Sequence, residues 1–328
     1  MKKLILLFTA LSCWACTTPT DNQGDMSIIP CPNKMEVKSN NFLTLGNEVS
    51  ISIDTPFPTS GGVMQYFSDR LKEHHLTLVQ KTSGKEGIRL VVDSRLPDEA
   101  YELIIDTQGI TLRANDSGAG FFYAIQSLLQ MLPATNSDNV SLPYLEIKDA
   151  PRFSYRGAMI DVARNFQSKE TVLKFIDLMS VYKMNHLHLH LTDDQGWRIE
   201  IKKYPQLTDI GSSRPRTMTG HSDYYFPRRF DTIPQKGFYT QEDIKEIVRY
   251  AQERFITVIP EIEMPGHSSA ALAAYPQYSC GLGKNYVVRD YMDIFDEVYC
   301  PHEGTIQFLQ DILSCLLYTS PSPRDPKT

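Results

Sequence analysis

The chain has 328 residues, which is enough for two domains of ordinary size. Its composition, 41% hydrophobic and 22% charged, is typical of a folded protein with a sizeable core. A net charge of −6 without any long basic run disfavours binding to nucleic acid or to a membrane surface.

The N-terminus has the pattern of an export signal. Two lysines precede an apolar stretch over residues 4–15, which is too short to cross a bilayer. The stretch ends at Cys13 and Cys16, each preceded by a small residue, and a polar segment follows. This arrangement resembles a bacterial lipoprotein signal, so we expect a signal over 1–16, lipidated at Cys16 or else at Cys13, and a tether over 17–29. A plain secretory signal is the alternative, and either signal predicts export; the lipoprotein signal predicts a lipid anchor at the periplasmic or cell-surface face of a bacterial envelope.

Residues 30–150 have the pattern of a small α+β accessory domain. Alternating apolar residues over 101–106 and 110–114 predict a hairpin around a short loop that contains glycine. Apolar residues at helical spacing predict two helices, over 64–74 and 120–132. We therefore expect an antiparallel sheet with helices on one face.

From residue 151 onward, predicted strands and helices alternate. The strands are expected over 157–162, 185–191 and 255–262. The intervening helices are expected to begin after the N-cap residues Ser168 and Thr240. The alternation is typical of βαβ units around a parallel sheet, in either a barrel or an open doubly wound fold. No glycine-rich phosphate loop follows a strand, which disfavours a nucleotide-binding open sheet.

The last helix is expected to begin near Thr305 and to stop close to Ser314. The segment over 315–328 contains prolines that break helices, and the string CLLYTSPSPRD within it matches a reading-frame translation of a common sequencing adapter. We therefore expect residues 151–314 to be the natural part of the second domain and the tail to be foreign. A genuine tail rich in proline and serine is the alternative, and the codons of the segment distinguish the two.

Two cysteines in the second domain are candidates for a disulfide. Cys280 and Cys300 occur in a segment with the composition of a loop, and an oxidising compartment permits them to pair. Two free thiols are the alternative. Cys31 has no evident partner in the sequence.

Polar residues follow each of the three predicted strands of the second domain. These polar clusters cover residues 161–164, 192–198 and 261–267. Catalytic groups of parallel α/β barrels gather at the C-terminal ends of the strands, so the clusters predict one shared site. Within the first cluster, Asp161 and Arg164 are expected to form a buried ion pair.

The histidines of the second strand also permit a metal site. His186, His188 and His190 alternate along the strand and therefore share a face. Further zinc ligands would come from Glu261, Glu263 and His267. The same histidines can instead form a hydrogen-bonded inner wall of a barrel. Nothing else in the sequence requires a metal, so we predict neither a metal nor another cofactor.

The motifs around these clusters are long and specific. They are Arg156-Gly157 with Asp161 and Arg164, then KMNHLHLHLTDDQGWR over 183–198, then EIEMPGH over 261–267. Together they resemble the β-N-acetylhexosaminidases of glycoside hydrolase family 20, and the resemblance extends over about residues 30–314. It implies an α/β protein in which a small α+β accessory domain precedes an incomplete (β/α)8 TIM barrel, represented here by its first three βα units.

The resemblance implies roles for individual residues. Arg156 would hold the hydroxyls of the terminal sugar through its planar guanidinium. Asp193 and His267 would form a supporting pair, in which the carboxylate fixes the tautomer of the imidazole. Three further residues are expected near the site without a fixed role: Asp194, Glu263 and Trp197, with core packing as the alternative for the tryptophan.

The resemblance also implies an activity. The family removes terminal, non-reducing β-linked N-acetylhexosamine with retention of configuration: the substrate's acetamido oxygen attacks the anomeric carbon and an oxazolinium intermediate forms. An Asp-Glu pair at the end of the fourth strand would orient the acetamido group and protonate the leaving oxygen. No such dipeptide follows Leu313, and Asp296-Glu297 precedes the last helix, so the chain is expected to be truncated and inactive.

The expected partners are glycans that end in N-acetylhexosamine, and a membrane through the lipid anchor only. Two other functions stay open at this point. One is a non-catalytic carbohydrate-binding lipoprotein, and the other is a metal-dependent barrel hydrolase.

Overall fold

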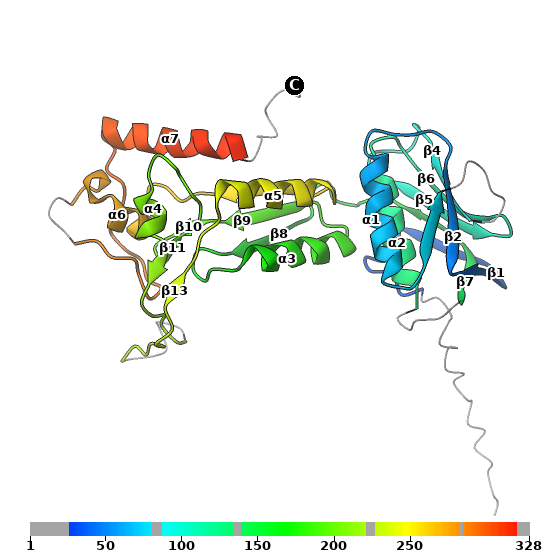
Figure 1. Cartoon of the computed structure of the whole chain (residues 1–328), viewed down its shortest axis with the longest axis horizontal. Helices are drawn as coiled ribbons and strands as arrows, with labels where there is room; N and C mark the ends of the chain where they lie inside the picture. The colour runs from blue at the N-terminus through cyan, green and yellow to red at the C-terminus, as the bar shows by residue number, and fades with distance from the viewer. Residues whose placement is uncertain (1–25, 81–86, 134–138, 221–226, 282–284, 320–328) are drawn as a thin grey trace, which may run out of the picture.

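The computed structural model describes residues 26–80, 87–133, 139–220, 227–281 and 285–319. They form two domains that lie side by side, and the chain passes from one to the other between Asp149 and Gly157 (Figure 1). The predicted signal and both candidate lipidation cysteines, Cys13 and Cys16, lie outside the described residues. None of the described helices is both long and apolar enough to cross a membrane.

The first domain contains a seven-stranded sheet in the order β1-β7-β5-β6-β4-β2-β3. Its strands are β1 (Lys34–Gly46), β2 (Glu48–Ile53), β3 (Thr77–Gln80), β4 (Ile88–Val92), β5 (Tyr101–Asp106), β6 (Gly109–Ala114) and β7 (Asn139–Asp149). The predicted hairpin is confirmed as β5 and β6, where Gly109 adopts a positive φ of 109° that favours glycine. The prediction of a purely antiparallel sheet is wrong, because β2 pairs in parallel with β3 and β4, and β4 pairs in parallel with β6.

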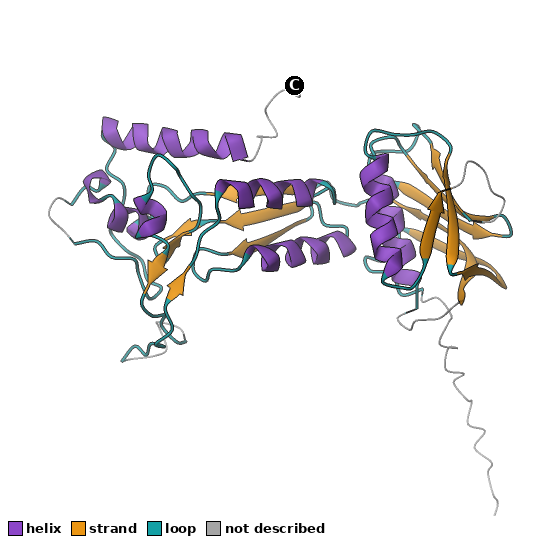
Figure 2. Cartoon of the chain, in the orientation of Figure 1, coloured by secondary structure: helices purple, strands orange, loops and turns teal. Residues whose placement is uncertain are grey.

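Two helices cover one face of this sheet, as predicted. They are α1 (Ser60–Lys72) and α2 (Ala119–Met131), and Figure 2 shows both between the sheet and the second domain. All of α2 except Leu129 and Gln130 is buried, because one of its sides packs on the sheet and another on the second domain. Phe122 of α2 packs against Phe255 of the second domain with ring centroids 5.4 Å apart.

The second domain is built on a three-stranded parallel sheet in the order β14-β9-β8. The strands are β8 (Gly157–Asp161), β9 (His186–His190) and β14 (Thr257–Glu261), and the helices α3 (Lys169–Val181) and α5 (Gln241–Gln252) cover one face. Ser168 and Thr240 cap these helices as predicted, and Thr240 forms a capping box with Asp243. The arrowheads in Figure 2 show that the strands end on the side away from the first domain.

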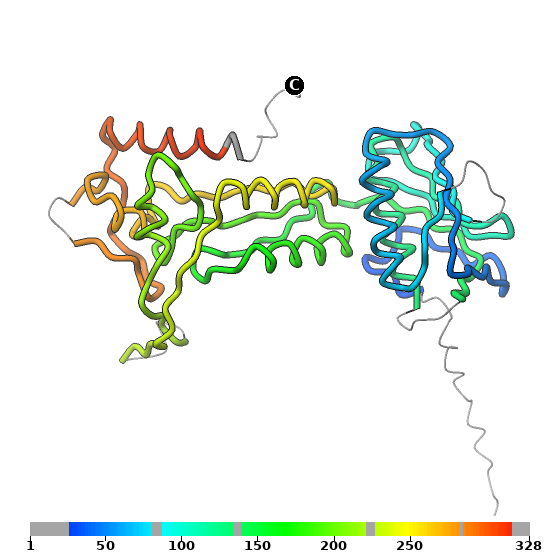
Figure 3. The backbone as a smooth tube through the Cα atoms, in the orientation of Figure 1, coloured from blue at the N-terminus to red at the C-terminus, as the bar shows by residue number. Residues whose placement is uncertain are grey.

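Short elements surround the C-terminal ends of these strands. They are β10 (Thr192–Asp193), β11 (Gly196–Trp197), α4 (Gln206–Asp209), β12 (Ser213–Arg214), β13 (Gln235–Lys236), α6 (Ser269–Ala274) and the 3-10 helix η1 (Pro276–Tyr278). Figure 3 traces the chain from β14 through α6 to the last helix, α7 (Glu303–Thr319). The prediction that the last helix stops near Ser314 is wrong, because α7 continues to Thr319. The side chain of Leu316 is buried in the domain core, and the first proline of the segment 315–328 is Pro321.

The other face of the three-stranded sheet is not covered by helices among the described residues. It carries Met159, which is 53% exposed, and Ile259, which is 37% exposed, with His188 between them in the same register. Apolar side chains at this exposure are what the inner face of an incomplete barrel presents.

Candidate functional site

The last residues of the three parallel strands form one row across the sheet. Asp161 pairs in register with His190, and His190 pairs with Glu261. Because parallel strands of equal length end at the same edge, the three polar clusters meet there, as the sequence predicted. The row lies on the sheet face that α3 and α5 do not cover, since Leu187 and Leu189 of β9 face the helices.

His190 stands between two carboxylates. Its Nδ1 lies 2.6 Å from Glu261 Oε2 and its Nε2 lies 3.0 Å from Asp193 Oδ2, while only 4% of the side chain is exposed. Burial lowers the pKa of His190, but the hydrogen bonds to Asp193 and Glu261 outweigh it and raise the pKa to about 9. The imidazole is therefore charged at neutral pH and holds both carboxylates in their ionised form.

Asp193 is the centre of a charged network. Although burial raises the pKa of this carboxyl, His190, Arg164 and His267 together hold it below its ordinary value. Arg164 Nη2 lies 2.6 Å from Asp193 Oδ2, and Arg164 Nη1 donates to Asp161 Oδ2 at 2.6 Å. The predicted pair of Asp161 and Arg164 is confirmed, but it is not buried: 28% of the Arg164 side chain is exposed.

His267 lies beside this network, on the loop that follows β14. Its Nδ1 is 3.0 Å from Asp194 Oδ2 and 3.3 Å from Asp193 Oδ1, and 48% of the side chain is exposed. The structure thus brings Asp193 and His267 together, with Asp194 the nearer partner. The hydrogen bond to Asp194 raises the pKa of His267. Asp194 is itself fixed by Ser269, whose backbone N–H and hydroxyl both donate to Asp194 Oδ1.

Arg156 is not part of this site, and the role predicted for it is wrong. It precedes β8 and so lies at the opposite end of the strand from Arg164. Its Nη2 lies 2.6 Å from Glu99 Oε1 and 3.0 Å from Tyr123 Oη, both in the first domain, and its Nε donates to the Lys183 carbonyl at 2.7 Å. With its donors used in this way, Arg156 joins the two domains.

Trp197 packs in the core rather than against a ligand. Only 1% of the residue is exposed, and its Nε1 donates to the Ile199 carbonyl at 2.7 Å. The neighbouring Arg198 is fully buried, and its guanidinium donates to carbonyls of the surrounding loops, including those of Ala163, Ser212 and Gly237. Arg198 therefore ties together the loops that carry the site, a role that the sequence analysis did not identify.

The two remaining glutamates have different surroundings. Burial and the neighbouring Glu261 raise the pKa of Glu263, and its backbone N–H donates to Thr192 Oγ1 at 2.9 Å, so Glu263 stands at the edge of the network. Glu297 forms an ion pair with Arg289 in the loop before α7, and 17% of its side chain is exposed. The ion pair commits Glu297 Oε1 to Arg289, and Glu297 lies in a loop rather than at the end of a strand.

The three histidines of β9 do not converge on one point, as a metal site requires. His186 Nδ1 lies 2.7 Å from Asn185 Oδ1 and the ring stacks on Tyr155, whereas His188 and His190 both contact Glu261. Candidate donors do gather within 4.8 Å in two sets, His190 with Glu261 and Glu263, and His267 with Asp193 and Asp194. In both sets, however, the imidazole nitrogens already face carboxylates, which is the geometry of an ion-pair network.

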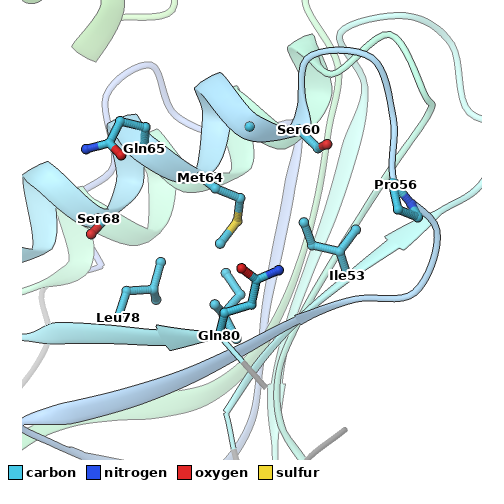
Figure 4. Close-up of a pocket in the computed structure, with 10 residues that line it drawn as sticks. Ile53, Pro56, Ser60, Met64, Gln65, Ser68, Leu78 and Gln80 are labelled. Carbon is cyan, nitrogen blue, oxygen red and sulfur yellow. The ribbon is translucent and has the colours of Figure 1, made fainter. Parts of the chain in front are cut away.

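A separate groove of about 440 Å³ lies in the first domain, between α1 and β3 (Figure 4). Ile53, Met64, Leu78 and Gln80 line it, and none of the described residues of its lining is titratable. It therefore offers no group for acid–base chemistry, and the candidate site remains the edge of the three-stranded sheet.

Both domains match models of one known family. Residues 25–150 match the model for domain 2 of glycosyl hydrolase family 20, and residues 153–324 match the model for the catalytic domain of the same family. A β-hexosaminidase of Porphyromonas gingivalis is 40% identical over 302 residues, which cover 88% of this chain and 36% of that protein. A β-hexosaminidase of Vibrio furnissii is 38% identical over 309 residues, which cover 93% of this chain and 48% of that protein. The chain thus spans less than half the length of either relative.

Solved structures agree with these matches. The β-N-acetylhexosaminidase from Bacteroides fragilis is similar with a TM-score of 0.73 and 35% identity, over 90% of this chain and 55% of that one. The exo-β-N-acetylglucosaminidase from Vibrio harveyi has a TM-score of 0.77 and 32% identity, over 93% of this chain and 47% of that one. The described second domain is accordingly the first part of a TIM barrel, and the chain belongs to glycosyl hydrolase family 20.

Proposed function

We propose that the whole protein removes terminal, non-reducing β-linked N-acetylhexosamine from glycans. The observation that carries the proposal is the network of Arg164, Asp193, His190 and Glu261 at the C-terminal edge of the sheet, in a chain of this family. The similar Vibrio harveyi enzyme was solved in complex with N-acetylglucosamine, which supports a sugar of this class.

Arg164 takes the role of the sugar-binding arginine in this proposal. Its guanidinium is fixed on two sides by Asp161 and Asp193 and is partly exposed at the site. A guanidinium has five N–H donors in a rigid fork, so those not used by the carboxylates can donate to neighbouring sugar hydroxyls. Fixing the fork before the sugar arrives lowers the entropy lost on binding.

Asp194 and His267 form the second part of the proposed site. The buried carboxylate holds the imidazole in one orientation while nearly half of the ring is exposed to a ligand. A fixed, positively polarised imidazole stabilises a carboxylate or a developing negative charge beside it. This placement suits the support of the catalytic acid that the family's reaction requires.

The proposed reaction retains configuration and is assisted by the substrate. The acetamido carbonyl oxygen attacks the anomeric carbon, an oxazolinium forms, and water then opens it, while a glutamic acid gives its proton to the leaving oxygen. In this proposal Asp296-Glu297 does not supply the acid, because it lies in the loop before α7 rather than at the end of a strand, and Arg289 forms an ion pair with Glu297. We therefore propose that the 328-residue chain lacks turnover of its own.

We also propose that the protein is exported and anchored by lipid through Cys16, with Cys13 as the second choice. Support comes from the sequence of residues 1–16. The anchor is tested by growing bacteria that express the chain in the presence of a radioactive fatty acid and measuring the label that the chain carries. Label that survives in Cys13→Ser and disappears in Cys16→Ser is expected, and label absent from both the parent and Cys13→Ser would contradict the anchor.

An assay with an aryl N-acetylglucosaminide tests the function. We expect the product of the full open reading frame to hydrolyse it without added cofactor and in the presence of chelator. The rate of hydrolysis with the 328-residue chain should equal that of the control without enzyme. A full-length product that binds N-acetylglucosamine but never hydrolyses the glycoside would show a carbohydrate-binding protein instead. Loss of activity with chelator would show a metal-dependent hydrolase.

A further inference from the structure

The loop before α7 packs directly on the candidate site. We call residues 285–299 the covering loop. Arg289 of this loop donates its backbone N–H to the Asp194 carbonyl at 2.9 Å, and the carbonyl of Glu297 accepts from the Ser268 hydroxyl at 3.2 Å. The position of Asp194, which orients His267, thus depends on where the covering loop lies.

Inside the covering loop, the ion pair of Arg289 and Glu297 is only partly satisfied. Arg289 Nε and Glu297 Oε2 are buried without a hydrogen-bond partner among the described residues. A buried polar atom without a partner costs free energy, so this ion pair by itself is a weak anchor. The loop is also held by Arg216 at Asp290 and by Gln195 at the Tyr291 carbonyl.

A short antiparallel bridge joins the segment that precedes the covering loop to the end of the loop. Ser279 pairs with Tyr299, and the backbone N–H of Cys300 donates to the Tyr278 carbonyl at 2.8 Å. Cys280 and Cys300 each follow a residue of the bridge, so both side chains leave on the side opposite to that of the paired residues. Both residues are free cysteines, and a hydrogen bond with the Cys300 thiol raises the pKa of the exposed Cys280 thiol.

We propose that Cys280 and Cys300 form an intramolecular disulfide that fixes the covering loop on the site. Cys280 is exposed and Cys300 is partly exposed, so an oxidant reaches the pair from solvent. The inference goes beyond the proposed glycosidase function and does not depend on it, because it concerns a covalent bond within the chain.

The reaction is a thiol–disulfide exchange with an oxidant that itself carries a disulfide. The thiolate of Cys280 attacks one sulfur of the oxidant, and a mixed disulfide forms while the other sulfur leaves as a thiolate. The thiolate of Cys300 then attacks Cys280 Sγ and releases the second sulfur of the oxidant. Two thiols of the chain are oxidised, the disulfide of the oxidant is reduced to two thiols, and the two protons pass to them.

Peptide mapping of the full chain tests the bond. The purified chain is treated with oxidised glutathione, free thiols are blocked with iodoacetamide, and the chain is cut after Lys and Arg and then after Glu. The second cut is needed because no Lys or Arg lies between Cys300 and Cys315, whereas cleavage after Glu303 separates them. We expect a linked pair of peptides containing Cys280 and Cys300, which a reductant converts to two peptides.

Matched variants show that the link is specific. Cys31→Ser and Cys315→Ser should keep the linked pair, whereas Cys280→Ser and Cys300→Ser should each leave the other cysteine blocked by iodoacetamide. Both cysteines blocked in the oxidised parent chain, or Cys280 linked to Cys31, to Cys315 or to a second chain, would overturn the proposal. The peptide map of the oxidised parent chain is enough to show whether the disulfide forms, so a variant that fails to fold does not weaken the test.

Hydrogen exchange tests whether the bond fixes the loop. We expect amides of the covering loop, including that of Arg289, to exchange several-fold more slowly in the oxidised chain than in the reduced chain. Amides of α2, which lies in the other domain, serve as the reference and should not change. Equal exchange rates of the covering loop in the two forms would overturn the claim that the disulfide holds it.

Discussion

Arg156 Nη2 and Glu99 Oε1 lie 2.6 Å apart, although the two residues belong to different domains. Asn185 adds to the contact, because its side-chain amide donates to Glu99 Oε1 at 3.2 Å. Close by, the buried Lys183 reaches into the first domain and donates from Nζ to Tyr101 Oη and Ser127 Oγ. Residues from two of the motifs used to recognise the family therefore connect the domains rather than bind substrate.

Removing the arginine of this contact should destabilise the chain. Arg156→Ala leaves Glu99 partly buried without its partner, so we expect the free energy of unfolding to fall by about 1–3 kcal/mol. Urea unfolding followed by circular dichroism measures it. Arg152→Ala is the control, because Arg152 is exposed nearby and its loss should change stability by less than about 0.5 kcal/mol. An effect of Arg156→Ala as small as that of the control would show that the contact contributes little.

Substitutions of the two arginines that flank β8 should affect the activity of the full-length protein differently. Arg164→Lys keeps a positive charge beside Asp161 and Asp193 but loses the planar fork, so we expect kcat/KM for an aryl N-acetylglucosaminide to fall roughly 10- to 100-fold. Arg156→Lys, assayed at a temperature where the protein is folded, should stay within about threefold of the parent. The reverse order of effects would restore the sugar-binding role to Arg156.

His190 should make stability depend on pH in the alkaline range. Its pKa is raised in the folded chain to about 9 from an ordinary value of 6.5, because the hydrogen bonds to Asp193 and Glu261 outweigh the effect of burial. The stabilisation is therefore complete below pH 6.5 and is lost as the pH rises through about 9. The difference in unfolding free energy between the parent and His190→Gln should shrink over this range.

The control for this titration is a histidine outside the network. His75→Gln is the matched substitution, because His75 is exposed in the first domain and contacts neither Asp193 nor Glu261. If the difference in unfolding free energy between the parent and His190→Gln does not change between pH 6.5 and 10, the imidazole is not charged in the folded chain.

Trp197 should contribute to stability and not to sugar binding. Because the indole is fully buried, we expect Trp197→Ala to cost about 3–5 kcal/mol and Trp197→Phe less. Circular dichroism during urea unfolding measures this, with Phe153→Ala as the control at a ring that is 65% exposed. A loss below about 1 kcal/mol for Trp197→Ala would contradict core packing.

Local patterns in the sequence predicted the second domain well. The capped helices α3 and α5 and the three parallel strands follow from N-cap residues and from the spacing of apolar side chains, which are local properties. The parallel pairing of β2 with β4 in the first domain was missed, because it depends on contacts between distant segments that short-range patterns do not encode.

The site was predicted in part. Asp193 and His267 come together because strand ends meet at one edge, and the sequence shows where strands end. Arg156 and Arg164 flank the same strand and belong to the same motif. The rule that chemistry gathers at C-terminal ends favours Arg164, whereas the role drawn from the resemblance was given to Arg156. The central position of His190 depends on the register between strands, which the sequence does not show.

The row of Asp161, His190 and Glu261 also determines where this fold tolerates changes in length. Successive residues of a strand face opposite sides, so one residue inserted within β9 would turn His190 toward α3 and α5 and remove the imidazole from between Asp193 and Glu261. Insertions between β12 and β13 leave the row unchanged. Relatives of different length should therefore differ in the connections, while the spacing within β8, β9 and β14 stays constant.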